Sequence, residues 1–242
     1  MEIYGIRSII EAIESSKEIS KVYLIKSSSS SYLFKSLINL LEKNNIKFTF
    51  VPKEKFTKFK NKNHQGAVAF LSPVSILSLE ELISKTFDQE KLQSYLLLDG
   101  ITDTRNFGAI IRTAVAADVT GIIISLNNSA PINSDVVKTS AGSAFKIPIA
   151  RVNNLKDALI HLNSIDIKIY SLSEKGDKSI YDISYKNSFG LILGSEDKGI
   201  SKGILKFSDE IIKIPISSKI DSLNVSSALS AAIFETVRQR NN

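Results

Sequence analysis

Short runs of Ile, Leu and Val recur through the last two thirds of the chain and are separated by stretches with helical spacing. The runs occupy residues 95–98, 121–125, 167–171, 189–193 and 210–214. Their nearly unbroken apolar character predicts strands covered on both faces, as in a parallel sheet wrapped by helices. Ligands bind at the carboxyl ends of the strands in such sheets. We therefore expect the functional residues in the segments that directly follow the runs.

The first part of the chain predicts a smaller α/β domain. Helical spacing of apolar residues occupies 6–15 and 32–44, and strand-like patterns occupy 21–25, 47–51 and 67–71. The serine run at 27–31 is too polar to pack, so we expect a loop without a functional role.

Length and composition fit two domains. With 242 residues, of which 43% are apolar, the chain can bury two cores. Pro73 and the polar, charged stretch after it, which contains one short amphipathic segment, indicate a connection between them. The predicted organisation is a first domain at 1–73, a linker at 74–93 and a second domain at 94–242.

Positive charge is concentrated in the first domain. Residues 1–73 carry twelve Lys or Arg against six Asp or Glu, whereas residues 74–242 carry nineteen of each. A basic domain joined to a neutral one indicates that the first binds a polyanion, although a lysine-rich solvated surface is the alternative. The run at 53–62 interleaves lysines with Phe56 and Phe59, as expected of an RNA-contacting surface that combines charge neutralisation with stacking. Its five lysines are Lys53, Lys55, Lys58, Lys60 and Lys62.

The composition excludes several classes of protein. The chain has no cysteine and only two histidines, which rules out disulfides and thiolate or multi-histidine metal sites as organising features. The most apolar stretch, 109–124, is interrupted by Arg112 and Asp118, so no membrane span is expected. The N-terminal residues do not have the pattern of a secretory signal, and we expect a cytoplasmic protein.

A polar segment at residues 99–112 follows the first apolar run and leads into a helical pattern. Asn106 or Asp103 would serve as the N-cap of that helix, and Gly108 as a packing glycine. Arg112 lies four residues after Gly108 and hence on the same face, where the missing side chain would leave space beside the guanidinium. An arginine in that place indicates an anionic or alkoxide-like partner.

A loop bracketed by glycines, residues 191–201, directly follows another apolar run. Two glycines five residues apart resemble half of a Walker motif, but Ile200 and Ser201 replace the Lys and Ser or Thr that would hold phosphate and magnesium. Nucleotide hydrolysis is therefore excluded. No Gly-x-Gly-x-x-Gly follows any run, which argues against an ordinary nicotinamide or flavin site. Glu196 remains as a carboxylate at the edge of the sheet.

The third polar segment, residues 212–226, precedes an alanine-rich helical pattern. Ser222 or Asn224 would cap that helix at its start, and Arg238 and Arg240 suit its C-terminal end. Considered alone, capping is a sufficient explanation for these residues.

Together the three segments resemble the three motifs of the SpoU (TrmH-like) family in the SPOUT superfamily of RNA methyltransferases. The matching residues are Asn106-Phe-Gly-Ala-Ile-Ile-Arg112, Gly194-Ser-Glu196 and Ser222-Leu-Asn-Val225, and their order and spacing match over residues 96–240. Ile3-Tyr-Gly-Ile-Arg7 and His64-Gln-Gly66 resemble the substrate-binding domain of the subgroup that modifies a guanosine of large-subunit ribosomal RNA, the RlmB type.

The resemblance implies an enzyme that transfers a methyl group from S-adenosylmethionine to a ribose 2'-hydroxyl of RNA, in a homodimer and without a metal. It implies a trefoil knot in the parallel-sheet domain, which general topology rules do not predict. It gives catalytic positions to Asn106, Arg112, Glu196, Ser222 and Asn224. It gives cofactor contacts to Gly194, Ile214 and Leu223, with Ser195, Gly199 and Ile216 as neighbours, and it adds His64 to the five lysines as an RNA-binding residue.

The family mechanism makes Arg112 the general base, which is chemically difficult. A free guanidinium is a very weak acid and scarcely gives up its proton. We therefore expect Arg112 to stabilise the developing alkoxide and to bind the adjacent phosphate. Asn106, Glu196 and Ser222 would fix its orientation.

Two alternatives stay open at this stage. One is a transfer-RNA ribose methyltransferase, which the separate basic domain disfavours. The other is a non-catalytic RNA-binding or ribosome-assembly factor of the same fold, which the intact positions Asn106, Arg112, Glu196 and Asn224 disfavour.

Overall fold

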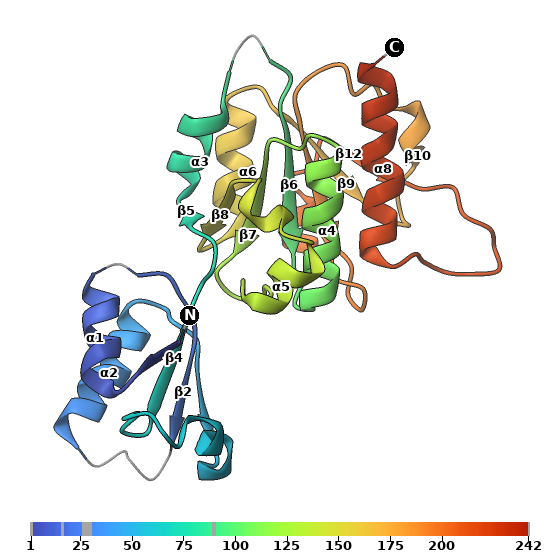
Figure 1. The fold of residues 1–242 in the computed structure, drawn as a ribbon. Helices are drawn as coiled ribbons and strands as arrows, with labels where there is room; N and C mark the ends of the chain where they lie inside the picture. The colour runs from blue at the N-terminus through green and yellow to red at the C-terminus, as the bar shows by residue number, and fades with distance from the viewer. Residues whose placement is uncertain (1, 16, 26–30, 89–90, 242) are drawn as a thin grey trace. The chain divides into compact units, whose positions relative to one another are not determined.

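The chain forms two compact units in a computed structural model (Figure 1). The structure describes residues 2–15, 17–25, 31–88 and 91–241. The first unit comprises Met1–Ser75 and Pro131–Ser134, and the second comprises Ile76–Ala130 and Asp135–Asn242. Each unit has a hydrophobic core of its own.

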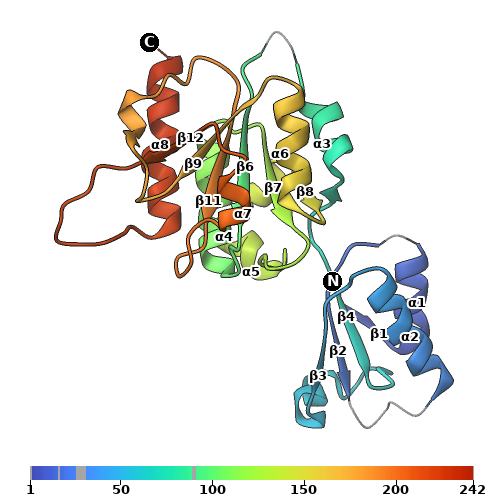
Figure 2. The same cartoon turned by 180° about the vertical axis from the view of Figure 1, so that it is seen from behind.

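The first unit is a four-stranded sheet with two helices against one face (Figure 2). The strand order is β1-β4-β2-β3, and β2 pairs in parallel with β3 and antiparallel with β4. Ser31 caps α2, while residues 27–30 of the predicted serine loop lie outside the described residues. The predicted helices and strands are confirmed, and β1 and η2 are additions. The elements are β1 (Glu2–Tyr4), α1 (Ile6–Glu14), β2 (Ile19–Ile25), α2 (Tyr32–Lys43), β3 (Phe48–Val51), the 3-10 helix η2 (Lys53–Phe59) and β4 (Ala67–Leu71).

Both faces of this small sheet carry apolar side chains. Successive side chains of a strand point to opposite sides, so each strand contributes to both faces. On the helix face, Leu24 packs in a core that includes Ile9 of α1, and both side chains are fully buried. On the other face, Val68 packs with Phe56 and Phe59 of η2. The 3-10 helix therefore covers part of the face that α1 and α2 leave open.

The second unit contains an eight-stranded sheet in which all neighbouring strands are parallel. Its order is β10-β12-β9-β11-β6-β7-β8-β5. The strands are β5 (Ile76–Leu77), β6 (Ser94–Asp99), β7 (Gly121–Ser125), β8 (Ile149–Val152), β9 (Lys168–Leu172), β10 (Lys178–Ser179), β11 (Phe189–Gly194) and β12 (Glu210–Lys213). The helices are α3 (Leu79–Thr86), α4 (Thr104–Ala116), α5 (Ser134–Thr139), η3 (Ser143–Phe145), α6 (Leu155–Ser164), η4 (Ile180–Asp182), α7 (Lys202–Leu205) and α8 (Val225–Arg240). The five predicted strands are confirmed.

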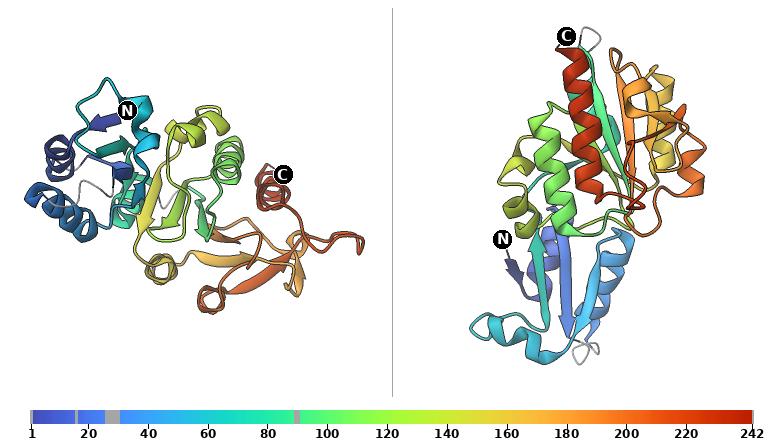
Figure 3. Two further views of the ribbon diagram at one scale, coloured as in Figure 1. Left: turned by 90° about the horizontal axis from the view of Figure 1, so that it is seen from below. Right: turned by 90° about the vertical axis from the view of Figure 1, so that its right-hand side faces the viewer.

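Helices cover both faces of the parallel sheet. Tyr95 and Leu97 of β6 point into a core that α3, α6 and α7 share, and Leu96 and Leu98, also fully buried, point to the opposite face. On that opposite face α4 and α8 pack side by side (Figure 3). The sheet thus has the layered architecture that the apolar runs predict.

The predicted linker at 74–93 differs from the structure. Most of its described part belongs to the second unit: β5 pairs with β8 at the edge of the sheet, and Leu82 of α3 is fully buried. Ser78 and Glu81 form a capping box that starts α3. The polar composition that suggests a linker comes from the exposed face of this short helix.

In the part of the chain that the structure describes, no helix combines the length and the apolar character needed to cross a membrane. The trefoil knot stays a prediction that rests on the resemblance.

Candidate functional site

The first motif begins where β6 ends and α4 starts. The Asp103 carboxylate caps α4 by accepting hydrogen bonds from the backbone N–H groups of Arg105 (2.9 Å) and Asn106 (2.8 Å). Of the two cap candidates, Asp103 is therefore the N-cap. The Asn106 side chain, three residues further on, is left for another partner.

That partner is Asn224, which joins all three motifs. Its amide nitrogen Nδ2 donates hydrogen bonds to Asn106 Oδ1 (3.0 Å) and to the Glu196 carboxylate. Its Oδ1 accepts from the backbone N–H (3.0 Å) and the hydroxyl (2.6 Å) of Ser226, which caps α8. Asn224 is thus both the helix cap and the connection between the loops after β6, β11 and β12.

The loop after β11 is folded tightly back on itself. Gly199 N–H donates to the carbonyl of Ser195 (2.9 Å), and these two residues form an isolated antiparallel bridge. A Cβ atom at Gly194 would lie 2.2 Å from the backbone of Gly199 and Ile200, so only glycine fits there. Gly194 therefore allows the two ends of the loop to approach each other closely.

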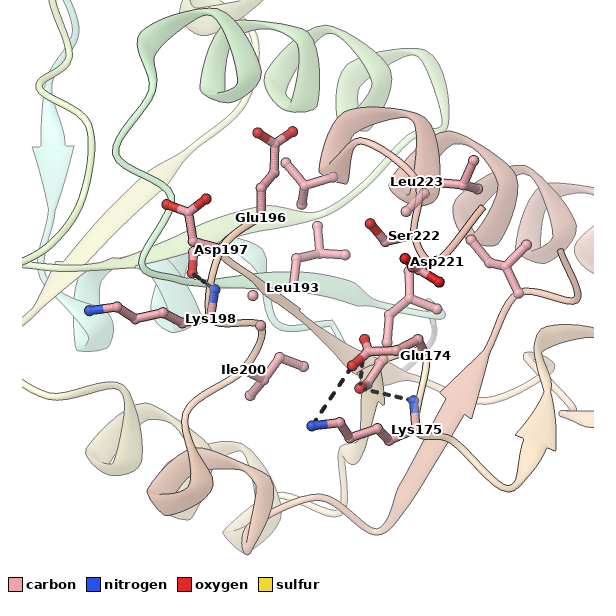
Figure 4. A pocket seen from close by; sticks show the side chains of 18 of the residues that line it. Glu174, Lys175, Leu193, Glu196, Asp197, Lys198, Ile200, Asp221, Ser222 and Leu223 are labelled. Atoms are coloured by element: carbon pink, nitrogen blue, oxygen red, sulfur yellow. Dashed lines mark hydrogen bonds and ion pairs between the residues drawn. The ribbon is translucent and has the colours of Figure 1, made fainter. Parts of the chain in front are cut away.

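A cavity of about 370 Å³ opens beside this loop (Figure 4). Its walls come from the segments after β9, β11 and β12 and from the start of α8. Glu196 and Ser222 also line it, whereas Asn106, Arg112 and Asn224 do not. All six residues expected to contact a cofactor are in the lining: Gly194, Ser195, Gly199, Ile214, Ile216 and Leu223.

Sequence reasoning missed one wall of the cavity. The end of β9 and the segment after it contribute the side chains of Leu172, Glu174 and Lys175, and Asp221 adds a second carboxylate. The rule that ligands bind after the carboxyl ends of parallel strands could have identified the segment after β9. The residue types in this segment match no known motif, so the sequence alone gives no other signal for it.

The lysines expected to bind RNA are exposed on η2 and the turn after it. The accompanying expectation of base stacking on Phe56 and Phe59 is wrong. These rings are only 2% and 4% exposed, because they pack against Val68 of the sheet. His64 lies against Phe56, with ring centroids 4.8 Å apart, and its Nδ1 accepts a hydrogen bond from the Gly66 N–H (3.0 Å). His64 therefore stabilises the turn before β4.

Within the described ranges, no group of three or more His, Asp or Glu side chains is placed to hold a metal ion.

Comparisons with known proteins agree with this geometry. A family model described as the SpoU rRNA methylase family matches residues 93–234, which is more than half of the chain. The chain belongs to the SpoU rRNA methylase family. A second model, RNA 2'-O ribose methyltransferase substrate binding, matches residues 3–77. The SpoU resemblance of the three motifs is confirmed, and the protein is an RNA methyltransferase.

Relatives of this SpoU methylase match most of its length. An uncharacterized tRNA/rRNA methyltransferase of Mycoplasma genitalium is 35% identical over 237 residues, 96% of this chain and 95% of that protein. The 23S rRNA (guanosine-2'-O-)-methyltransferase RlmB of Xanthomonas campestris is 37% identical over 177 residues, 73% of this chain and 71% of that protein. The crystal structure of the SpoU methyltransferase AviRb from Streptomyces viridochromogenes with AdoMet has a TM-score of 0.64 at 22% identity, covering 100% of this chain and 91% of that chain. The last match confirms the α/β fold with a parallel sheet.

Arg112 of this SpoU methylase is exposed and has no hydrogen bond or ion pair with any described residue. The expected orienting contacts are absent: Asn106 and Glu196 both bind Asn224 instead. The expected space at Gly108 is also filled, because a Cβ there would lie 2.6 Å from Thr139 Cβ. Gly108 thus allows α5 to approach α4, and its absent side chain does not serve Arg112.

Proposed function

We propose that this SpoU methylase transfers the methyl group of S-adenosylmethionine to the ribose 2'-hydroxyl of a guanosine in 23S ribosomal RNA. The observation that carries the proposal is the Asn224 amide, which joins the Asn106 and Glu196 side chains beside the cavity. The match to the substrate-binding model and the likeness to an RlmB protein support the ribosomal target. Such a target would place the enzyme in the cytoplasm.

The residues around the cavity fit S-adenosylmethionine. A volume of about 370 Å³ is in the range of small-molecule sites. Leucine and isoleucine side chains, among them Leu172, Ile214 and Leu223, would pack against an adenine ring. The carboxylates of Glu174 and Asp221 suit the positively charged ammonium and sulfonium groups of the donor. When bound, the donor supplies a methyl group on a sulfonium, which requires in-line attack.

The protein's own residues then position the attacking ribose. Asn224 fixes Asn106 and Glu196 relative to each other, so the site is arranged before the RNA binds. Arg112, with no competing partner among the described residues, is available to the phosphate next to the target ribose and to the developing alkoxide. Charge stabilisation is the role that the chemistry of a guanidinium permits.

We further infer that two chains pair through the second unit, as the resemblance implies. Phe234 on α8 is 47% exposed, so this helix offers an apolar ring that a second chain could cover. Light scattering should give twice the mass of one chain, and Phe234→Glu should shift the protein toward the monomer. A parent protein that is monomeric at micromolar concentration would contradict pairing.

The test of the reaction is tritium transfer from labelled S-adenosylmethionine to purified ribosomal and transfer RNAs, followed by nucleoside analysis. We expect label in 2'-O-methylguanosine from 23S rRNA. Label in tRNA would establish the second target class, and label in a base would refute the reaction type. Absence of label in all RNAs would leave a non-catalytic factor.

A further inference from the structure

Three aromatic side chains gather on the face of the small sheet that α1 and α2 do not cover. Tyr4 and Tyr23 are the partners of Val68 on its two sides, and Phe70 stands opposite Lys21. Tyr4, Tyr23 and Phe70 are partly exposed and pack against the buried cluster that contains Val68. We call these three residues the aromatic patch.

The rings of the patch are held at fixed angles. Tyr23 and Phe70 meet edge to face with centroids 5.2 Å apart, and Tyr4 lies 5.7 Å from Phe59. Phe59 is buried and supports the patch from below. Rings that are already packed on one side lose little freedom when a flat ligand covers the other.

Lysine ammonium groups lie over the rings of the patch, where a stacked base would take their place. The Lys21 ammonium lies 4.9 Å from the ring centroid of Tyr23 and 5.0 Å from that of Phe70, and it donates a hydrogen bond to the Tyr23 hydroxyl (3.0 Å). Lys58 lies 5.8 Å from Phe70, and Lys62 lies 5.8 Å from Tyr4. We call Lys21, Lys58 and Lys62 the basic rim.

Charges on the patch are predominantly positive. No member of the basic rim forms an ion pair within the described part of the chain. The hydrogen bond from Lys21, with the charges of Lys55 and Lys58, lowers the pKa of the Tyr23 hydroxyl. Glu2 also reaches the patch, where its carboxylate accepts a hydrogen bond from Tyr4. The surface therefore combines flat apolar rings with a surplus of ammonium groups.

We propose that the aromatic patch and its basic rim bind an unpaired segment of the RNA substrate, with bases stacked on Tyr4, Tyr23 and Phe70 and phosphates on the lysines. The proposal rests on the proposed function and defines the class of RNA that the first unit recognises. Every base has a face that stacks on an aromatic ring, whereas paired bases in a duplex are covered by their neighbours. A duplex would use the rim alone.

The experiment uses the full chain, RNA binding as its readout and no methyl donor. Because the chain has no tryptophan, Tyr23→Trp introduces a single reporter at the patch. We expect an unpaired oligonucleotide to quench its fluorescence, and a blunt duplex of equal length to leave it unchanged. Tyr23→Leu should weaken binding of the unpaired RNA about tenfold and duplex binding little. Tyr23→Phe, which keeps the ring, should bind like the parent.

Two further variants separate stacking from charge. Lys21→Gln should weaken binding of both RNAs and make the salt dependence less steep by roughly one ion. Phe50→Leu is the matched control, because Phe50 is 42% exposed but lies on the same side as Phe48, which packs in the helix-side core. It should change neither affinity.

The proposal is overturned if folded Tyr23→Leu binds unpaired RNA with parent affinity, or if the Tyr23→Trp signal does not respond to it. RNA binding that is insensitive to salt and to Lys21→Gln would also refute it, because the lysines would then not contact the phosphates. The outcome is independent of methyl transfer: a chain that stacks RNA but methylates none would refute the proposed reaction and leave the patch standing.

Discussion

At the scale of single residues, Asn224 uses both ends of its amide. The oxygen caps α8, and the nitrogen holds Asn106 and Glu196 together. A primary amide carries two N–H donors, so one side chain can serve both acceptors at once. The stability of a helix and the geometry of the site therefore depend on the same residue.

Replacing Asn224 by Asp separates these two roles. A carboxylate still caps α8, so stability should change by less than about 1 kcal/mol. It cannot donate to Asn106 and it repels Glu196, so methyl transfer should fall by roughly a hundredfold or more. Thermal unfolding and single-turnover methylation measure the two effects.

The matched control is Asn154→Asp, because Asn154 caps α6 by accepting from the Lys156 N–H (3.0 Å). It should leave turnover unchanged. Undiminished turnover in Asn224→Asp would contradict the role given to the amide nitrogen.

Arg112→Lys tests what the guanidinium does. The structure shows no described residue that holds the planar group in place, so its charge should dominate, and we expect turnover to fall about tenfold while remaining measurable. Arg112→Gln, which removes the charge, should reduce turnover at least a further tenfold. Rates from labelled methyl transfer at saturating donor make the comparison. Near-complete loss in the lysine variant would instead assign the role to the planar fork, and full activity would refute both.

The sequence identified the motif residues but not their partners. Asp103 and Asn106 are both good cap residues, and only the position of the α4 backbone decides between them. The space beside Gly108 could not be assigned either, because Thr139 reaches it from a segment far along the chain.

At the scale of elements, the loop after β11 depends on a glycine. Gly194→Ala would place a methyl group 2.2 Å from backbone atoms of Gly199 and Ile200, so the loop must open. We expect the dissociation constant for S-adenosylmethionine to rise at least tenfold, which calorimetry would measure. Gly203→Ala is the control, because its Cβ would meet only the flexible end of Lys156 at 3.3 Å. Equal affinities of the two variants would show that the loop tolerates the change.

A buried carboxylate near the end of α8 makes stability depend on pH. Hydrogen bonds from Arg238 (2.8 Å) and Gln239 (2.8 Å) lower the pKa of Glu235 to about 2. A depressed pKa stabilises the fold above the ordinary value near 4.5 and loses this contribution as pH falls toward 2. Glu235→Gln should therefore lower the melting temperature at pH 7 and flatten its decline between these values. Exposed Glu11→Gln should leave the profile unchanged, and an unaltered profile in Glu235→Gln would refute the linkage.

Elements with several turns or several apolar residues were predictable, and shorter ones were not. The strands β5 and β10 have two residues each, which is too short to display the alternation of a strand. In β8, Arg151 interrupts the apolar pattern. These strands exist because a neighbouring strand supplies hydrogen-bond partners. That information lies in the sheet and not in the local sequence.

At the scale of the whole molecule, the sequence located the basic charge correctly but misjudged which aromatic rings accompany it. Phe56 and Phe59 turn inward because η2 covers the sheet, while Tyr23 and Phe70 stay partly exposed on strands. Alternation within a strand is visible in a sequence, but which face a short 3-10 helix will cover is not.

The division of charge between the units predicts a division of binding. Residues 76–242 contain all cavity residues and equal numbers of acidic and basic side chains, whereas the surplus lies before them. A fragment of residues 76–242 should bind S-adenosylmethionine as the full chain does. Its affinity for RNA should be lower and should fall less steeply with salt, by about 0.7 in the logarithmic slope for each phosphate that the lysines of the first unit no longer neutralise. Fluorescence anisotropy of labelled RNA between about 50 and 200 mM salt measures the RNA affinity and its salt dependence. A fragment with the parent slope would mean that the second unit binds the phosphates, and the role of the first unit would then be limited to the bases that stack on it.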